Sequence, residues 1–543
     1  MTGGDDPMSI AVQGAALVSL IWSCAVFLVQ AIGITQLYRN HSSPRPKPVS
    51  PSLGNGETPQ VTIIRPVKGV EPRLYECLAS TFLLIYPKSK LTIYLCVAST
   101  DDPAYPILQK VLSDFPGFDA KVLVEEDDPV LHGTGGHVNN LGPNPKIRNM
   151  SRAYREAKGD LIWIVDCNIW LGTGSAGRMV DKLCGFGQGG ARTTPYKFVH
   201  QLPLVVDIED RDKAAEQQSL LSKDDVALAR THEKGLLDYG GRLEEMFMST
   251  SHAKFYSAIN TVCVAPCIVG KSNMFRKSHL DLMTDPSQNP ILSATDARRG
   301  RGLDFFSSYI CEDHLIGDLI WRSRVPPSPT SAAATATTYR NHGLVFGEVA
   351  IQPTAGMSVA AYVARRVRWL RVRKWTVLLA TLVEPGVEPF VCSLHLSFAL
   401  TTLSWVRERL GIPPTWGAMA AIWVSTVTVW MLVDRWFTNM LRRLQSVEAD
   451  DNTPSFALGS CRKGGIQQRP FLEWLAAWLG RESLALPIWT WAVLLGTTVN
   501  WRGKQFKVRM DMSVVEVGPQ KVPSPAPSAV VSRPNSRNKD RVD

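Results

Sequence analysis

Three aspartates stand in order along the central part of the chain, and each comes after an apolar run. Asp102 and Asp166 follow runs rich in Val, Ile and Leu, and Asp313 follows Glu312 after a third run. Carboxylates at the ends of buried strands can hold Mg2+ or Mn2+, and such a cation stabilises a leaving diphosphate. A further carboxylate that reaches a hydroxyl can act as a general base. The order therefore suits a nucleotide-sugar site, with Asp166 as metal ligand and Asp313 as base.

Each acidic position also has a purely structural explanation. Asp102 precedes a proline, an arrangement typical of a helix start, and Asp166 can cap the turn after its strand. Glu312 and Asp313 suit the positive end of a helix dipole. Two residues after Asp166 the chain has Asn168, which offers an amide oxygen but no charge. The second protein ligand of the expected cation, Mn2+ or Mg2+, therefore stays open.

A basic run lies further along the chain, at Arg365, Arg368 and Trp369. Residues three apart share one face of a helix, so both guanidinium groups can meet one ligand. Guanidinium groups bind diphosphates in a two-pronged geometry, and the indole can stack or anchor at a membrane interface. The alternative is a basic helix that lies on an anionic lipid surface. The spacing alone favours neither.

Alternating strand and helix patterns must position these side chains. Four short apolar runs are typical of buried strands, and helical runs separate them, so we expect an α/β fold with a mainly parallel sheet. Such sheets bind ligands beyond the carboxyl ends of their strands, where Asp102 and Asp166 fall. The expected strands are 61–65, 91–97, 121–124 and 161–165, and the expected helices are 74–84, 107–115 and 147–157.

Apolar segments flank this α/β region on both sides. Residues 10–33 are long and apolar enough to cross a bilayer, and the basic residues that follow predict that the chain continues on the cytosolic side. Three uncharged runs come later, at 389–406, 410–433 and 483–501. Charge places both the 434–468 loop and the C-terminal tail in the cytosol. Three full crossings cannot satisfy both, so one run is expected to be re-entrant or interfacial.

The chain therefore divides into a membrane frame and a catalytic domain. We expect an N-terminal transmembrane helix, a linker, a cytosolic catalytic domain with an inserted loop, a C-terminal membrane region and a disordered tail. Their ranges are 10–33, 34–60, 61–380 with the loop at 207–241, 386–501 and 511–543.

Composition excludes some classes of protein. The net charge is +10, but the basic residues gather at membrane boundaries and in the tail, which argues against a nucleic-acid partner. The ten cysteines show no C-x-x-C pair, so neither a zinc site nor a disulfide framework is expected. The oligomeric state is left open.

Longer stretches of the sequence resemble the ceramide glucosyltransferases, in particular their fungal members. The resemblance covers roughly residues 60–380 and resumes at 478–509. It is carried by 65–72, 101–104, 144–147, 161–166, 250–252, 276–277, 312–313, 365–369 and 481–503.

The resemblance implies a Rossmann-like GT-A catalytic domain that transfers glucose from UDP-glucose to the primary hydroxyl of ceramide, with inversion. It implies an integral, multi-pass protein of the Golgi or endoplasmic reticulum membrane, with membrane lipid around it and the catalytic domain in the cytosol. The family's three aspartates correspond to Asp102, Asp166 and Asp313, and its basic signature corresponds to Arg365, Arg368 and Trp369. Donor binding is expected at Lys68, Asp102, Lys146 and Asp166, and acceptor binding at His252.

Other readings remain at this stage. His252 can be a packed histidine beside Phe255 and Tyr256. The acceptor can be a polyprenyl phosphate or a growing polysaccharide, although a polymer channel needs more membrane helices than this chain offers. A membrane scaffold without catalysis is the alternative from a different class, and the intact acidic positions argue against it.

Overall fold

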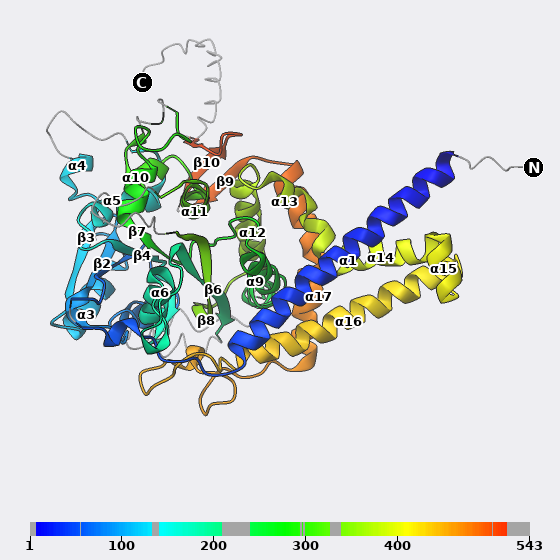
Figure 1. Ribbon diagram of the computed structural model, residues 1–543, viewed down its shortest axis with the longest axis horizontal. Coiled ribbons are helices and arrows are strands. Elements are labelled where there is room, and N and C mark those ends of the chain that lie inside the picture. The colour runs from blue at the N-terminus through cyan, green and yellow to red at the C-terminus, as the bar shows by residue number, and fades with distance from the viewer. Residues whose placement is uncertain are drawn as a thin grey trace, which may run out of the picture.

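The computed structural model describes residues 7–517, except 55, 133–140, 209–238, 294–295, 297–298, 326–337 and 502. An α/β body occupies one end of the molecule, and a bundle of long helices projects from the other (Figure 1). The N-terminal end of α1 lies at the far tip of this projection. The part of the expected 207–241 loop from 209 to 238 lies outside the described residues.

A mixed eight-stranded sheet, counted over the described residues, forms the centre of the body in the order β3-β2-β1-β4-β7-β6-β8-β5. Strands β3, β2, β1 and β4 run parallel, as predicted. β7 is antiparallel to both β4 and β6, so the other half of the sheet is mixed rather than parallel. The strands are β1 (Val61–Pro66), β2 (Leu91–Val97), β3 (Asp119–Val124), β4 (Leu161–Val165), β5 (Trp170–Leu171), β6 (Tyr196–Asp207), β7 (Ser272–Arg276) and β8 (Arg340–Thr354).

Helices cover both faces of the sheet, which is why the parallel strands read as continuous apolar runs. Successive residues of β1 point to opposite cores: Ile63 packs in one and Ile64 in the other. The first core includes α2 (Leu74–Ala79), α3 (Tyr105–Asp114) and α6 (Ser175–Cys184). The second includes α5 (Pro145–Arg155), α10 (Lys277–Met283) and α11 (Glu312–Arg322).

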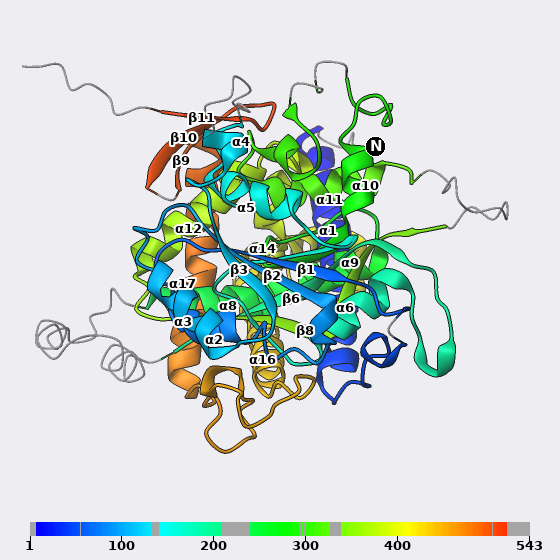
Figure 2. The same ribbon diagram turned by 90° about the vertical axis from the view of Figure 1, so that its left-hand side faces the viewer.

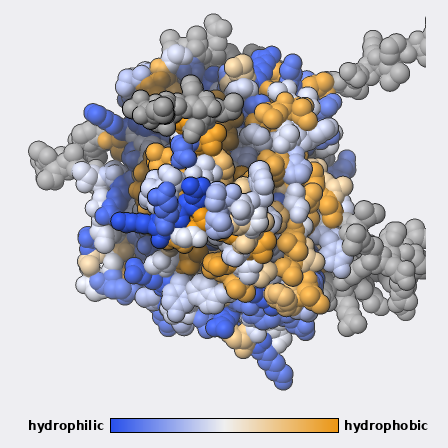
Figure 3. Space-filling view, turned by 90° about the vertical axis from the view of Figure 1, so that its right-hand side faces the viewer, coloured by the Kyte–Doolittle hydropathy of each residue, from blue (hydrophilic) through white to orange (hydrophobic). Residues whose placement is uncertain are grey.

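The projecting bundle consists of α1 (Pro7–His41), α14 (Pro389–Thr402), α15 (Ser404–Leu410) and α16 (Trp416–Arg442). In the described residues, α1 and α16 are long and apolar enough to cross a membrane. α14 and α15 together pass the same test but bend by 84° at their junction. The end-on view in Figure 3 shows apolar residues spread over much of this face.

The third C-terminal apolar run does not join the bundle. Its residues end helix α17 (Phe471–Trp489) and then form a short π-helix (Thr490–Leu494) and strand β9 (Thr498–Trp501). One side of α17 is buried through Trp474 and Trp478, while Leu472 and Leu486 are exposed on the other. The run therefore belongs to a two-sided helix, as at an interface, and α17 is not among the candidate membrane spans of the described residues.

A small sheet of β11, β10 and β9 returns the C-terminal part of the chain to the α/β body. β10 is Lys504–Val508 and β11 is Val514–Glu516. Phe506 and Val508 pack on Ile310, just before α11, and β9 lies beside α12 (Val359–Arg373; Figure 2). β11 falls inside the range 511–543 for which the sequence predicts disorder, and 518–543 lie outside the described residues.

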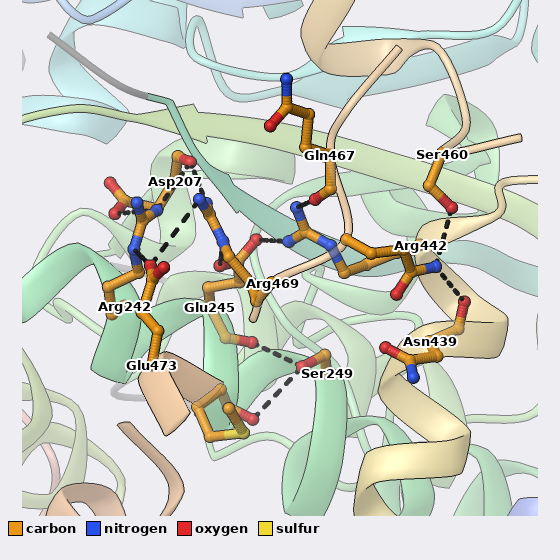
Figure 4. Close-up of polar contacts among 12 residues, drawn as sticks. Asp207, Arg242, Glu245, Ser249, Asn439, Arg442, Ser460, Gln467, Arg469 and Glu473 are labelled. Carbon is orange, nitrogen blue, oxygen red and sulfur yellow. Dashed lines mark hydrogen bonds and ion pairs between the residues drawn. The ribbon is translucent and has the colours of Figure 1, made fainter. Parts of the chain in front are cut away.

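An ion-pair network ties the body to the membrane helices (Figure 4). Arg242 on α8 (Gly240–Phe247) binds Asp207 at the end of β6 at 2.7 Å and Glu473 on α17 at 2.8 Å. Glu245, also on α8, binds Arg442 at the end of α16. The end of β6, helix α16 and helix α17 thus all bind to α8, which connects the α/β body to the helix bundle.

Candidate active site

Asp166 lies at the carboxyl end of β4, between two lysines. Its backbone N–H donates to the Lys271 carbonyl, which holds the start of β7 against the end of β4. Oδ1 lies 3.0 Å from Lys146 Nζ, and Oδ2 lies 3.0 Å from Lys271 Nζ. Burial works to raise the pKa of Asp166, but the two ammonium groups outweigh it and hold the pKa well below its usual range. The carboxylate is therefore ionised.

Lys146 links Asp166 to the second acidic group of the site. Its Nζ also lies 3.1 Å from Glu312 Oε1. The helix that carries it begins with a cap: Asn144 Oδ1 accepts from the backbone N–H of Lys146 at 2.8 Å, and a proline follows Asn144. Asn144 Nδ2 donates to Glu312 Oε2 at 3.2 Å. The first turns of α5 and α11 are thereby fixed to each other.

Glu312 and Asp313 form the first turn of α11. Burial raises the pKa of both carboxyl groups, and Lys146 partly opposes this. The Asp313 side chain lies close to the backbone before β7. A Cβ on Gly270 would be only 2.7 Å from Asp313 Oδ2. The two carboxyls and Lys146 line a pocket. A carboxyl with a raised pKa at a pocket suits a general base.

Asp102 follows β2 and Asp166 follows β4, at the same end of the parallel strands, with β1 between them. Its Oδ1 accepts from the backbone N–H of Gly69 at 2.9 Å and from that of Ala104 at 2.9 Å. The carboxylate thus joins the loop after β1 to the loop after β2. Lys68 is exposed on the first of these loops. In the described contacts Asp102 positions the Lys68 loop and does not touch Asp166.

The predicted arginine face lies on α12. Arg365 Nε donates to Glu244 Oε1 at 2.9 Å, and its guanidinium lies 4.9 Å from the Trp369 ring. Arg368 is half-buried on the same helix. None of the contacts described for Arg365 reaches Asp166 or Asp313.

His252 ends a π-helical turn (Met248–His252). Its ring stacks on Tyr256, with centroids 5.1 Å apart, and lies 5.6 Å from Phe247. Burial, aided by Arg366 and Arg373, lowers the pKa of His252 to about 3, so the ring is neutral. Its Nδ1 is buried with no hydrogen-bond partner among the described residues. The packing explanation holds for the ring, and a free ring nitrogen remains for a ligand.

Lys271 belongs to the charged cluster around Asp166, but the sequence alone does not predict it there. It stands in a segment without a motif, and 105 positions separate it from Asp166. The sequence singles out Glu312 only as the neighbour of Asp313 at an expected helix start, whereas in the structure Glu312 shares Lys146 with Asp166. The signal for Glu312 is its place beside Asp313, and we find no signal for Lys271.

The fit of a divalent cation can be tested on the oxygen ligands near Asp166. No group of three or more His, Cys, Asp or Glu side chains able to hold a metal occurs among the described residues. However, Asn168 Oδ1 is buried and without a hydrogen-bond partner in the described contacts, two positions after Asp166. Magnesium is commonly held by one or two protein ligands together with substrate phosphates. The residues therefore fit a cation that the substrate shares, not one that the protein holds alone.

Comparison with known proteins gives close relatives along the whole chain. The family model described as glycosyl transferase family 21 matches residues 20–210 and 330–514. A ceramide glucosyltransferase of Pyricularia oryzae is 56% identical over 94% of this chain and 96% of its own. One of Gibberella zeae is 50% identical over 96% and 98%. A third, of Candida albicans, is 32% identical over 84% and 88%.

Among solved structures, a mannosyltransferase of Pyrobaculum calidifontis in complex with GDP-Man and Mn2+ is similar at 14% identity. The match covers 80% of this chain and 96% of that chain, with a TM-score of 0.36.

Proposed function

This chain belongs to glycosyltransferase family 21, among the ceramide glucosyltransferases, and from that premise we propose how its residues carry out the transfer. The donor is UDP-glucose and the acceptor is the primary hydroxyl of ceramide. The single observation that supports this site is Lys146, which joins Asp166 to Glu312 beside Asp313. Two lysines and three carboxylates thus meet at the end of β4, where this sheet type binds nucleotides.

Asp313 is the proposed base. The ceramide oxygen attacks the anomeric carbon of glucose from the face opposite the leaving group, and its proton passes to the Asp313 carboxylate. The bond from that carbon to the diphosphate breaks, so UDP leaves and the product is a β-glucoside. Burial raises the pKa of Asp313, which strengthens it as a base, and Gly270 leaves room for its carboxylate.

The donor side is proposed to use fixed positive charge. Lys146 and Lys271 lie where the diphosphate must end, next to Asp166. Asp166 and Asn168 would hold a divalent cation, Mn2+ or Mg2+, which supplies additional charge stabilisation for the leaving diphosphate when bound. Asp102 fixes the loop that presents Lys68. Arg368 is proposed to meet the diphosphate, while Arg365 and Trp369 hold α12 in place.

The membrane frame is proposed to deliver the acceptor. Ceramide cannot leave the bilayer at low cost, because each exposed CH2 costs about 0.8 kcal/mol. α1 then crosses toward the cytosol, α14 with α15 crosses back, and α16 returns, which leaves the α/β body and α17 on the cytosolic surface. His252, with its unpartnered ring nitrogen, is proposed on the acceptor side. The organelle is the Golgi or the endoplasmic reticulum.

Transfer from a panel of labelled UDP-sugars to a panel of lipids tests the proposal. We expect purified protein in nanodiscs to make glucosylceramide from UDP-glucose, with the product read by mass spectrometry. The Asp313→Asn variant keeps the shape of the side chain but loses the base, so its turnover should fall by about two to four orders of magnitude. Binding of UDP-glucose should be retained.

Two outcomes would contradict the proposal. Glucose transfer to a polyprenyl phosphate but not to ceramide would replace the acceptor. Near-normal turnover in Asp313→Asn would remove Asp313 from the base role while leaving the acceptor in place.

A further inference from the structure

A second pocket lies between α12, α17 and the segment that leads into α14. It shares no lining residue with the pocket at Asp313. Its polar wall is formed by Arg366, Glu384, Glu388 and Arg481. Its other wall is apolar and includes Ile488. None of these residues has a place in the chemistry proposed above.

The polar wall is internally balanced in charge. Arg481 Nη2 binds Glu388 Oε2 at 2.6 Å, and Arg366 Nη2 lies 3.5 Å from Glu384 Oε1. An anionic ligand such as a phosphate would face two carboxylates and would have to displace their partners. A neutral ligand with both donors and acceptors can add to the wall without leaving a charge unpaired. The charge balance therefore favours a neutral amide or alcohol head.

Exposed leucines lie beside the apolar side of this pocket. Ile488 is buried at the pocket, whereas Leu486 on the same helix is 46% exposed. Helix α13 (Leu378–Val383) borders the same region and exposes Leu379 by 76%. Exposed leucines beside a polar recess are typical of a site at a membrane surface. Two hydrocarbon chains can leave the pocket along this border while a polar head stays inside.

The pocket also connects to His252. Phe247 lines the pocket and lies 5.6 Å from the His252 ring, centroid to centroid. Ser251, the residue before His252, donates its hydroxyl to Glu388 Oε2 at 2.9 Å. A ligand in this pocket therefore borders the residue assigned to the acceptor side.

From these observations we propose that the pocket binds the amide head of the acceptor lipid. This rests on the proposed function and adds the place where the lipid is recognised. Glu388 accepts from the amide N–H or the secondary hydroxyl, and Arg481 and Arg366 donate to the amide carbonyl. The primary hydroxyl then extends past Phe247 and His252 toward Asp313. An ester lipid with a primary hydroxyl lacks the amide N–H that donates to Glu388.

Filling the pocket tests this with a matched control on one helix. Ala485 lines the pocket, whereas Ala476 is exposed elsewhere on α17. Ala485→Leu should raise the KM for ceramide by about tenfold or more, because one side chain is added where the head binds. The KM for UDP-glucose and the rate of its hydrolysis should stay unchanged. Ala476→Leu should change none of these. An unchanged ceramide KM in Ala485→Leu, or an equal rise in the donor KM, would overturn the proposal.

Two further measurements keep the test independent of that variant. Glu388→Gln should narrow the preference of the enzyme for ceramide over diacylglycerol, and an unchanged preference would count against the assignment. In the unmodified protein, a ceramide with a photoreactive group at its amide should label the peptide around residues 481–489, and excess ceramide should prevent the labelling. Labelling confined to other segments would also contradict the proposal that this pocket binds the amide head. If the unmodified protein fails to glucosylate ceramide at all, the proposed function fails rather than the pocket.

Discussion

At the level of single residues, the site depends on how one lysine is shared. Lys146 faces Asp166 at 3.0 Å and Glu312 at 3.1 Å, and its charge also acts on Asp313. The same ammonium that is proposed to meet the diphosphate therefore acts to lower the pKa of Asp313, the proposed base. In the proposed mechanism, donor binding and the protonation of Asp313 are coupled through this side chain.

That coupling predicts a shift in pH dependence. Burial raises the pKa of Asp313, and Lys146 is the largest influence that lowers it, so Lys146→Met removes most of the opposition to burial and raises this pKa further. The base then takes up its proton at a higher pH. The acid limb of the kcat/KM profile should move to higher pH, as measured by initial rates across a pH series. Lys158→Met, at an exposed lysine paired with Asp119, is the control and should leave the limb in place. A limb that stays or moves to lower pH would disprove the coupling.

Gly270 gives a second prediction at this scale. A Cβ there would lie 2.7 Å from Asp313 Oδ2, so Gly270→Ala must displace the carboxylate. A displacement of about 1 Å at a reacting group can cost about a hundredfold in rate, so kcat should fall strongly while UDP-glucose binding persists. In Gly172→Ala the new Cβ would meet its nearest atoms at 3.7 Å, and activity should be retained. Equal activity in both variants would place Asp313 away from the chemistry.

Some of this site could be predicted from sequence and some could not. Asp166 ends a run of buried residues, so its place at the edge of the sheet follows from local pattern alone. Lys271 reaches Asp166 only because β7 inserts antiparallel beside β4, and no local pattern encodes that pairing. The spacing of Arg365 predicts only that it shares a helix face with Arg368. Its ion pair with buried Glu244 depends on the packing of α8 against α12, which no local pattern encodes.

At the level of elements, prediction succeeded where a strand is apolar on both faces. The runs that became β1, β2 and β4 are mostly apolar and buried throughout, and their bounds follow closely, whereas β3 has exposed polar residues and begins two residues before the expected 121–124. β6 and β7 bury polar side chains such as His200 and Asn273, so their pattern does not read as strand. The run 483–501 is as apolar as a membrane span, but it is divided between a two-sided helix and a β-hairpin, because its buried face packs on protein.

Helix α1 gives a prediction at the element level. It packs on α9 (Ala253–Val262), which follows His252, and a Cβ on Gly33 would lie 2.1 Å from the Lys254 carbonyl oxygen. Gly33→Ala must therefore separate the two helices, at a cost of about 1–3 kcal/mol. The temperature of half-inactivation in detergent should fall. Gly14→Ala on the same helix meets nothing within 4 Å and should have no effect. A tolerated Gly33→Ala would mean that α1 anchors the chain without supporting α9.

At the level of the whole molecule, the crossing order predicts which cysteines a reagent can reach. Cys263 and Cys461 are exposed on the α/β body and on the segment after α16. In sealed microsomes with the cytosolic face outward, a membrane-impermeant maleimide should label both. Pro414→Cys, in the turn between α15 and α16, should be labelled only after detergent is added, in a background where the two native cysteines are serine. Labelling of the Pro414→Cys variant in intact vesicles would reverse the proposed direction of α16.

The small C-terminal sheet has a consequence for how the protein is made. Val514 donates its backbone N–H to the Ser308 carbonyl at 2.9 Å, and Phe506 is fully buried in the cluster with Ile310. The turn that precedes the base is thus completed by residues that the ribosome synthesises roughly two hundred positions later, after every membrane helix has emerged. A nascent chain still being inserted has its aspartates but lacks the support that places them. Catalytic competence should therefore arise only after this small sheet has emerged from the ribosome, so that chains still being inserted do not consume nucleotide sugar at the translocon.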